Sequence, residues 1–403
     1  MPGSLEIRAA DKRQREAIGW EGDIVMKKFL VLALVVLAAA LCRTAAYAQA
    51  TASATLLGTV TDKSGAVVPN ATVSILEPTT GLTRNTKTAD TGLYRFDLLP
   101  AGNYRTEITA PGFARLVFGK VEVSVAKVTT VDGSLEPSSQ TEMVTVEAEA
   151  SAVIDTSRSD ISRPITPEEI KDLPLNGRDF ANLAYLAPGT KPADPYDPTK
   201  KRVAVFATNG SAGRNVNVTV NGIDDKDNTV GGPVMQLPLE AILEFNISTQ
   251  RFSAVNGRSE GAAVNVITKS GTNDPHGSIY FMDRNEALNA NDYFSEQSHQ
   301  SKSPYSRQEF GGSIGAPVRK DKDFLFFAIE RQREATNIVV DPTSYAELSL
   351  VTSLGAQPVK NIPTPYFDWR YNGRYDHHFN ENETLSVSYS NQNNRGLNDQ
   401  SGS

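Results

Sequence analysis

The chain has 403 residues, which is enough for two or three domains, and carries a formal net charge of -7 with a pI near 5.3. An acidic chain lacks the basic face that electrostatic binding of nucleic acid requires, so no nucleic-acid partner is expected.

The first apolar segment predicts export from the cytoplasm. Met26-Lys27-Lys28 precedes the apolar run Phe29–Leu41, and Ala46-Tyr47-Ala48 follows it. This order is typical of a secretory signal peptide over residues 26–48, cleaved between Ala48 and Gln49. A transmembrane anchor is disfavoured, because spanning a bilayer takes about 20 apolar residues.

Residues 1–25 carry mixed charges that do not suit a signal peptide, so we interpret them as a mis-assigned N-terminal extension. The only cysteine, Cys42, lies within the expected signal peptide. The mature chain would then contain neither disulfides nor cysteine-bound metal, and we expect no cofactor.

Residues 55–135 predict a β-sandwich. Short alternating segments such as Leu56–Thr61 and Thr72–Leu76 are separated by turn residues every 8 to 12 positions. The phrases Thr91–Phe96, Leu99–Tyr104 and Ala110–Phe113 complete a resemblance to the carboxypeptidase regulatory-like domain. That resemblance implies a transthyretin-like sandwich without peptidase activity. Similar folds include carbohydrate-binding modules, but we expect aromatic residues such as Tyr94 and Phe113 to belong to the core rather than to a sugar-binding surface.

Residues 136–150 predict a linker that contains one extended segment. The polar run Glu136–Gln140 is followed by an alternating stretch that resembles a TonB box, a strand that pairs with a periplasmic energy-transducing protein. An edge strand of the neighbouring sandwich or plug is the alternative. The candidate contact residues are Glu142, Met143, Val144, Thr145 and Val146.

Residues 151–272 resemble the plug domain of an outer-membrane receptor. Thr166 and Pro167 begin a short helix, and Phe180–Leu186 forms a second one. Val216–Val220 alternates as a strand and leads into an Asn-Gly turn. The plug motif residues are Leu175, Asn176, Gly177, Arg178, Asn221, Gly222, Gly257 and Arg258.

Two sequence patterns suggest a calcium site and a hydrolase serine, but the neighbouring residues disfavour both. The carboxylates within Asn221–Asn228 lack the spacing of an EF-hand calcium loop, so we interpret them as a solvated loop and expect no metal site. Gly311–Gly315 spells G-x-S-x-G, but a hydrolase needs a helix after this turn, and here another strand follows. We therefore predict no catalytic residue and no enzymatic activity.

Residues 273–403 predict the start of a transmembrane β-barrel. Alternating segments are joined by short connections such as Arg319–Lys322 on one side and by long ones such as Asn285–Pro304 on the other, which is the habit of outer-membrane barrels. The expected strands are Ser278–Arg284, Ser306–Ala316, Phe324–Arg333, Tyr366–His377 and Thr384–Tyr389.

The stretch Gly261–Tyr280, with its run Val-Asn-Val-Ile-Thr-Lys-Ser-Gly-Thr-Asn, resembles the plug-to-barrel junction of TonB-dependent outer-membrane receptors of the Oar-like branch. The resemblance implies a mainly β chain: a transthyretin-like sandwich, then an α+β plug, then the first strands of an incomplete barrel. Because family barrels have 22 strands of about 10 residues each, we expect an N-terminal fragment.

The implied function is that of a receptor in the cell outer membrane that binds an unknown extracellular ligand and imports it with energy from the inner membrane. Its partners would be a TonB-type periplasmic protein, outer-membrane lipid and that ligand. The sandwich and the box would lie in the periplasm. A secreted all-β carbohydrate-binding or adhesion protein is the alternative, and a secreted hydrolase is a weaker one.

Overall fold

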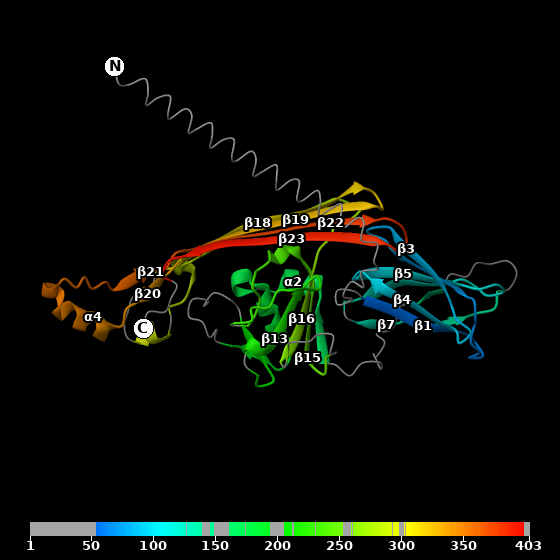
Figure 1. Ribbon diagram of the computed structural model, residues 1–403, viewed down its shortest axis with the longest axis horizontal. Coiled ribbons are helices and arrows are strands. Elements are labelled where there is room, and N and C mark those ends of the chain that lie inside the picture. The colour runs from blue at the N-terminus through cyan, green and yellow to red at the C-terminus, as the bar shows by residue number, and fades with distance from the viewer. Residues whose placement is uncertain are drawn as a thin grey trace, which may run out of the picture. The chain divides into compact units, whose positions relative to one another are not determined.

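The computed structural model describes residues 54–138, 146–148, 161–193, 205–252, 261–297 and 304–398, together with 259 and 302, and leaves out 126, 174, 212, 230 and 292 within those ranges. The expected signal peptide and its cleavage site at Ala48 and Gln49 lie outside the described residues. Strands dominate the part that is described (Figure 1). The prediction of a mainly β chain is therefore confirmed.

The N-terminal strands form two sheets that enclose one core, as expected for a sandwich. One sheet has the order β4-β1-β7 with β8 also paired to β1, and the other has the order β3-β2-β5-β6-β9. Tyr94 is 1% exposed within this core, and Phe113 packs against it, in agreement with their expected structural role. The strands are β1 (Ala54–Asp62), β2 (Thr72–Glu77), β3 (Leu82–Lys87), β4 (Leu93–Leu99), β5 (Gly102–Thr109), β6 (Leu116–Val123), β7 (Val128–Thr130), β8 (Gly133–Leu135) and β9 (Val146–Ala148).

The plug unit, residues 161–271, is built on a five-stranded sheet with the order β10-β15-β16-β13-β14. β13 and β16 run parallel, and the other neighbours run antiparallel. The main elements are β10 (Ile161–Ile165), α2 (Pro167–Asp172), η2 (Asn176–Arg178), η3 (Phe180–Leu186), β13 (Val216–Val220), β14 (Ile223–Asp224), η6 (Leu239–Ala241), β15 (Ile242–Gln250) and β16 (Ala262–Thr268). Two short strands, β11 (Thr190–Pro192) and β12 (Phe206–Thr208), pair with each other, and η5 (Gly213–Asn215) precedes β13.

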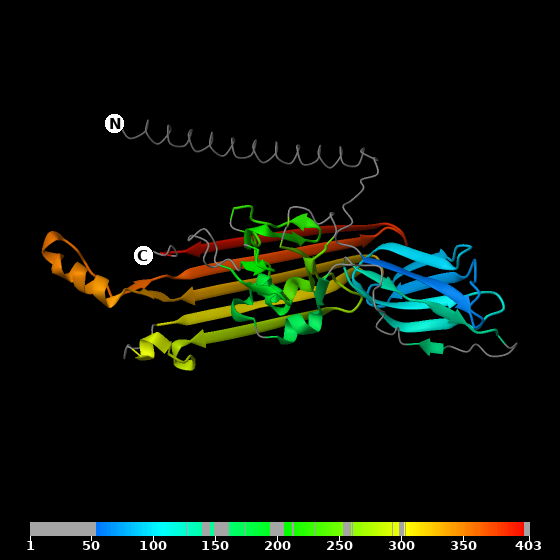
Figure 2. The ribbon, with the colours of Figure 1, turned by 90° about the horizontal axis from the view of Figure 1, so that it is seen from below.

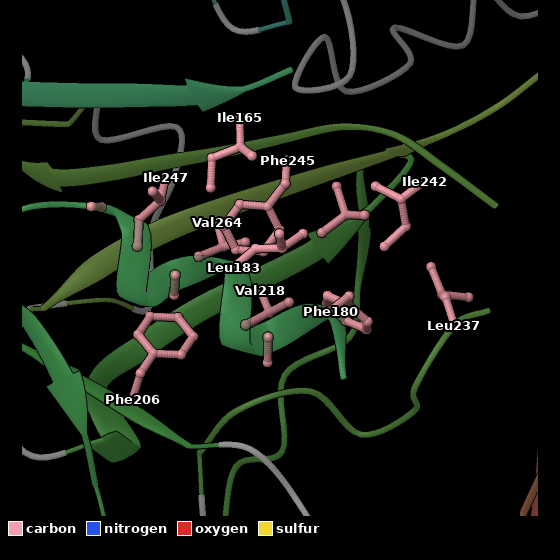
Figure 3. Close-up of a cluster of buried hydrophobic side chains, with 14 of the residues drawn as sticks. Ile165, Phe180, Leu183, Phe206, Val218, Leu237, Ile242, Phe245, Ile247 and Val264 are labelled. Atoms are coloured by element: carbon pink, nitrogen blue, oxygen red, sulfur yellow. The ribbon is translucent and has the colours of Figure 1, made fainter. Parts of the chain in front are cut away.

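The core of the plug unit lies between the sheet and the short helices that cross it. Figure 3 shows Phe180 and Leu183 of η3 directed toward Val218, Phe245 and Val264 of the sheet. All five side chains are at most 1% exposed. Burial of apolar surface contributes about 25 cal/mol per Å², so this cluster is the main source of the plug unit's stability.

The last strands form one antiparallel sheet, here called the wall sheet, in the order β17-β18-β19-β22-β23. Figure 2 shows its long strands side by side. They are β17 (His276–Asn285), β18 (Ser306–Arg319), β19 (Asp323–Ala335), β22 (Tyr366–His378) and β23 (Thr384–Gly396). Each contains the strand expected from the sequence, and all five extend beyond the expected range.

One end of the wall sheet has short turns and the other has long connections. The long ones carry η8 (Glu286–Leu288), α3 (Tyr293–Gln297), the hairpin of β20 (Asn337–Val339) and β21 (Asn361–Pro363), α4 (Pro342–Leu350) and η9 (Thr352–Leu354). No helix within the described ranges is both long and apolar enough to cross a membrane.

Side chains alternate between the two faces of the wall sheet, as a strand requires. On β19, Phe326, Ala328 and Glu330 are at most 2% exposed, whereas Leu325 and Phe327 are nearly half exposed. The buried face carries the polar contacts to the plug unit, and we call it the inner face. The other, with its exposed apolar side chains, is the outer face.

Candidate functional site

The loop that follows α2 presents an arginine to the wall sheet. α2 begins with a capping box: the Thr166 hydroxyl accepts a hydrogen bond from the Glu169 amide, and the Glu169 carboxylate accepts one from the Thr166 amide. After the helix, Gly177 and Arg178 have φ angles of 86° and 48°. Two successive left-handed residues reverse the chain sharply and are favourable only with glycine at one of them.

Arg178 is the centre of a buried ionic cluster between the plug unit and the wall sheet. Its Nε lies 3.1 Å from the carboxylate of Glu330 on β19, and its Nη2 lies 3.3 Å from that of Glu240 on η6. The guanidinium also lies 4.1 Å from the ring centroid of Tyr280 on β17. Arg178 and Glu330 have side chains that are 8% and 1% exposed, so water screens this pair very little.

A second arginine, Arg370 on β22, completes the cluster from the wall side. It donates to Glu330 at 2.9 Å, to Asp368 at 2.8 Å and to Asp179 of the plug unit at 2.8 Å. The Tyr280 hydroxyl donates to Glu330 at 2.6 Å. Burial raises the pKa of Asp179 to about 6, and the Arg370 guanidinium counteracts that rise.

A second group of contacts joins the plug unit to the turn end of the wall sheet. Asn221 and Gly222, with φ angles of 50° and 80°, form the expected turn after β13. Asn221 Nδ2 donates to Thr268 Oγ1 at 2.9 Å and to Ser388 on β23 at 3.4 Å. The Thr268 carbonyl in turn accepts from Arg374 on β22 at 2.7 Å.

The joint between plug unit and wall sheet is held by further contacts. The Ser270 hydroxyl donates to Asp376 on β22 at 2.5 Å. A side chain at Gly271 would meet the carbonyl oxygens of Leu325 and Ala316, 2.4 and 2.7 Å from the Cβ position, so glycine is required there by close approach of the backbone.

The predicted plug motif residues do not all fall in this interface. Arg178 and Asn221 contact the wall sheet, whereas Leu175 packs against the plug core. The Asn176 side chain and both Gly257 and Arg258 lie outside the described residues. The roles assigned to these motifs stay predictions.

The candidate TonB box is described only at its end. Glu142, Met143, Val144 and Thr145 lie outside the described residues, whereas Val146 begins β9. β9 runs parallel to β6 of the sandwich, with Val146 opposite Leu116. The last residue of the candidate box therefore belongs to a sandwich edge strand, which is the alternative that the sequence left open.

The wall partners of Arg178 were missed from the sequence. Glu330 and Arg370 lie on strands whose other face is mostly apolar or aromatic, and each has a polar neighbour two residues away on the same face. One signal could have identified them. Charged residues at alternate positions of a membrane strand indicate a face that contacts something other than lipid.

Two carboxylates after β13, those of Asp225 and Asp227, are buried, so the expectation of a solvated loop is wrong for them. Asp225 accepts a hydrogen bond from the Met235 amide at 3.2 Å, and burial raises its pKa to about 7. Within the residues that the structure covers, no group of three or more histidine, cysteine or acidic side chains is placed to hold a metal ion. Ser313, the serine of the G-x-S-x-G pattern, lies inside β18 and contacts Ser278 at 3.0 Å.

Comparison with protein families matches two parts of the chain. Residues 55–136 match the carboxypeptidase regulatory-like domain, and residues 267–347 match an outer membrane beta barrel domain. The TonB-dependent transporter Oar of Myxococcus xanthus is 26% identical over 309 residues, which make up 73% of this chain and 28% of that protein. The chain thus spans less than a third of the length of its curated relative.

Parts of the chain are similar to two solved structures, a receptor and a transporter. The siderophore receptor PirA from Acinetobacter baumannii is 19% identical, with a TM-score of 0.40 over 58% of this chain and 32% of that one. The outer membrane transporter YddB from Escherichia coli is 10% identical, with a TM-score of 0.43 over 56% and 32%.

The sequence matches confirm the expected resemblance to TonB-dependent receptors of the Oar-like branch. They also confirm the expected outer-membrane location. The relative is named as a transporter, and the prediction of no enzymatic activity agrees with that name. A secreted adhesion or carbohydrate-binding protein is not favoured.

Proposed function

We propose that this chain, which belongs to the TonB-dependent outer-membrane receptors, supplies the plug and the first wall strands of a receptor that binds an extracellular ligand and imports it. The buried ionic contact between Arg178 and Glu330 is the observation that supports the proposal most. A plug must stay seated until it is pulled, and it must also be able to leave.

The cluster meets both requirements because each side keeps a partner when the two separate. Arg178 would retain Glu240, since both lie in the plug unit. Glu330 would retain Arg370 and Tyr280, since all three lie in the wall sheet. Removing a partner from a buried charge costs about 3–5 kcal/mol, and the retained partners keep the cost of release near the lower end of that range.

The energy for release would come from a TonB-type periplasmic protein that pairs with residues 142–146. An extended segment needs free backbone donors and acceptors for such pairing, and flexible chain on either side. Because Val146 pairs with the sandwich edge, the partner would bind first at residues 142–145 and then displace β9. The extracellular ligand would be bound by the long connections and the plug unit.

The pairing with TonB can be tested in the complete gene product. Val144→Pro removes a backbone donor and fixes φ, so it should abolish binding to the purified periplasmic domain of the host's TonB-type protein. Ser139→Pro, in the polar linker, is the matched control and should bind normally. Equal binding by both variants would argue against residues 142–146 as the contact segment.

Import can be tested in the host with labelled siderophores, vitamins, sugars and peptides. At least one compound should be taken up by cells that carry the unaltered gene. Uptake should be lost both on deletion of the gene and on Val144→Pro, with Ser139→Pro as control. Recovery of the protein from the soluble periplasm would contradict the receptor assignment altogether.

A further inference from the structure

The outer face of the wall sheet carries arginines with no carboxylate partner among the described residues. Arg331 and Arg333 lie on β19, one and three residues beyond the buried Glu330. Neither forms an ion pair with any described residue, and the Nε of Arg331 is buried without a hydrogen-bond partner. By contrast, Arg178, Arg307 and Arg370, which lie at the inner face, are all paired with acids.

Aromatic rings hold these two arginines in place. The Arg331 guanidinium lies 5.6 Å from the ring centroid of Phe310 and 5.3 Å from that of Trp369, its neighbours on β18 and β22. The Arg333 guanidinium lies 5.9 Å from the ring of Phe367. Cation–π contacts orient a guanidinium but leave its N–H donors free, so both side chains can still bind an anion.

An apolar groove adjoins the arginines on the same face. It has a volume of about 630 Å³, and Gly312 is among the residues that line it. Ile279 and Phe281 line it and are 93% and 65% exposed. Phe310 belongs both to the groove and to the ring pair around Arg331, so the groove ends at the arginines. The other apolar side chains that line the groove are Ile314, Phe327 and Ile329.

The position of the arginines along the strand indicates which side of the membrane they reach. They lie at the end of β19 that leads into the long connection carrying α4, away from the short turn at Arg319–Asp323. In outer-membrane barrels the long connections are extracellular. The strand positions level with Arg333 carry more cations than acids. Arg395 of β23 lies opposite Phe367, and Asp283 of β17 is the acid in the same row across the strands.

We propose that this surface binds a phosphorylated lipid of the outer leaflet, with an acyl chain in the groove over Gly312 and a headgroup phosphate on Arg331 and Arg333. A planar guanidinium can donate two parallel hydrogen bonds to a phosphate, and these are strong where water is excluded. The apolar groove matches an acyl chain, and the adjacent arginines match a phosphate. Together they are complementary to a lipid that is both acylated and phosphorylated. The inference depends on the outer-membrane location but not on which ligand is imported.

The probe is lipid A with two phosphates, compared with fully dephosphorylated lipid A, added to the detergent-solubilised complete gene product. Native mass spectrometry measures how much of each stays bound. The unaltered protein should prefer the phosphorylated form about tenfold, and Arg331→Gln/Arg333→Gln should lose about tenfold in affinity for it and most of the preference. Arg331→Lys/Arg333→Lys keeps the charge and should recover part of both.

The matched control is Arg105→Gln/Arg251→Gln, which removes two exposed arginines outside the wall sheet and should bind like the unaltered protein. Heat-modifiable migration on gels verifies that each variant is folded. Equal retention of phosphorylated and dephosphorylated lipid by the unaltered protein would overturn the proposal, even if a variant failed to fold. So would equal loss in the control, because Arg331 and Arg333 would then act only through the net charge.

Discussion

Arg178→Met is the most direct test of the contact between plug unit and wall sheet. Methionine keeps much of the length of the arginine but removes the cation that lies between Glu330 and Glu240. Glu330 is 1% exposed, so the loss is not screened by water. Removing one partner of a buried pair costs about 3–5 kcal/mol, and the remaining bonds from Arg370 and Tyr280 should hold the cost near the lower end.

The loss should appear as easier opening of the plug unit in urea. With a slope of about 2 kcal/mol per M for a domain of this size, a loss of about 3 kcal/mol lowers the midpoint by about 1.5 M. Ser248→Cys, at a buried position of β15, introduces a thiol into a mature chain that is expected to have none. Reaction of that thiol with a maleimide reports opening of the plug unit, and heat-modifiable migration reports the barrel.

Two further variants distinguish the effect of the Arg178–Glu330 ion pair from the effect of losing any arginine in the plug unit. Glu330→Gln alone should also lower the midpoint, and the double variant should lower it by less than the two single effects combined, with a coupling of about 0.5–3 kcal/mol. Arg163→Met breaks an ion pair with Glu169 whose side chains are 39% and 35% exposed, and it should cost less than about 1 kcal/mol. A midpoint for Arg178→Met equal to that of Arg163→Met would refute the proposed role of the cluster.

Three other predictions concern single positions of the plug unit. Gly177→Ala should destabilise it by about 1 kcal/mol or more in the same assay, because φ is 86° there and a Cβ would lie 3.1 Å from the Arg307 guanidinium; no change would contradict the left-handed turn. Gly271→Ala should slow assembly of the heat-modifiable form, because its Cβ would meet two backbone carbonyls, whereas Gly112→Ser, in open space, should assemble normally even if the sandwich is weakened. Asp225 has its pKa raised from 3.8 to about 7 by burial, so the folded state binds the extra proton and stability should fall as pH rises from about 4 to 7. Asp225→Asn should remove that fall and raise stability above pH 7 by up to about 4 kcal/mol, as measured by urea titration at several pH values.

The sequence predicted the elements far better than it predicted the contacts between them. Strand alternation identified all five wall strands, and the start of α2 followed from Thr166 and Pro167. Both depend on residues close together in the chain. The partner of Arg178 is 152 residues away, and no local pattern specifies which charge on which strand comes opposite it.

The extended run after the linker shows a second limit. A segment that alternates and is flanked by polar residues suits pairing with any exposed sheet edge. The sequence therefore left open whether residues 142–146 serve a partner or the chain's own sandwich. β9 places Val146–Ala148 on the edge of β6, an outcome that depends on which edge is free in the folded chain.

The two faces of the wall sheet explain how one strand can serve two contacts that must behave differently. Glu330 and Arg331 are adjacent in β19, but successive residues point to opposite faces, so one contacts the plug unit and the other lies on the outer face. The backbone between them pairs with both β18 and β22, so we expect that a change in one contact does not reach the other through a shift of the strand. Glu330→Gln should therefore loosen the plug unit without altering lipid retention, and Arg331→Gln should do the reverse. A strand whose two substitutions changed both properties alike would have to move as the plug is released.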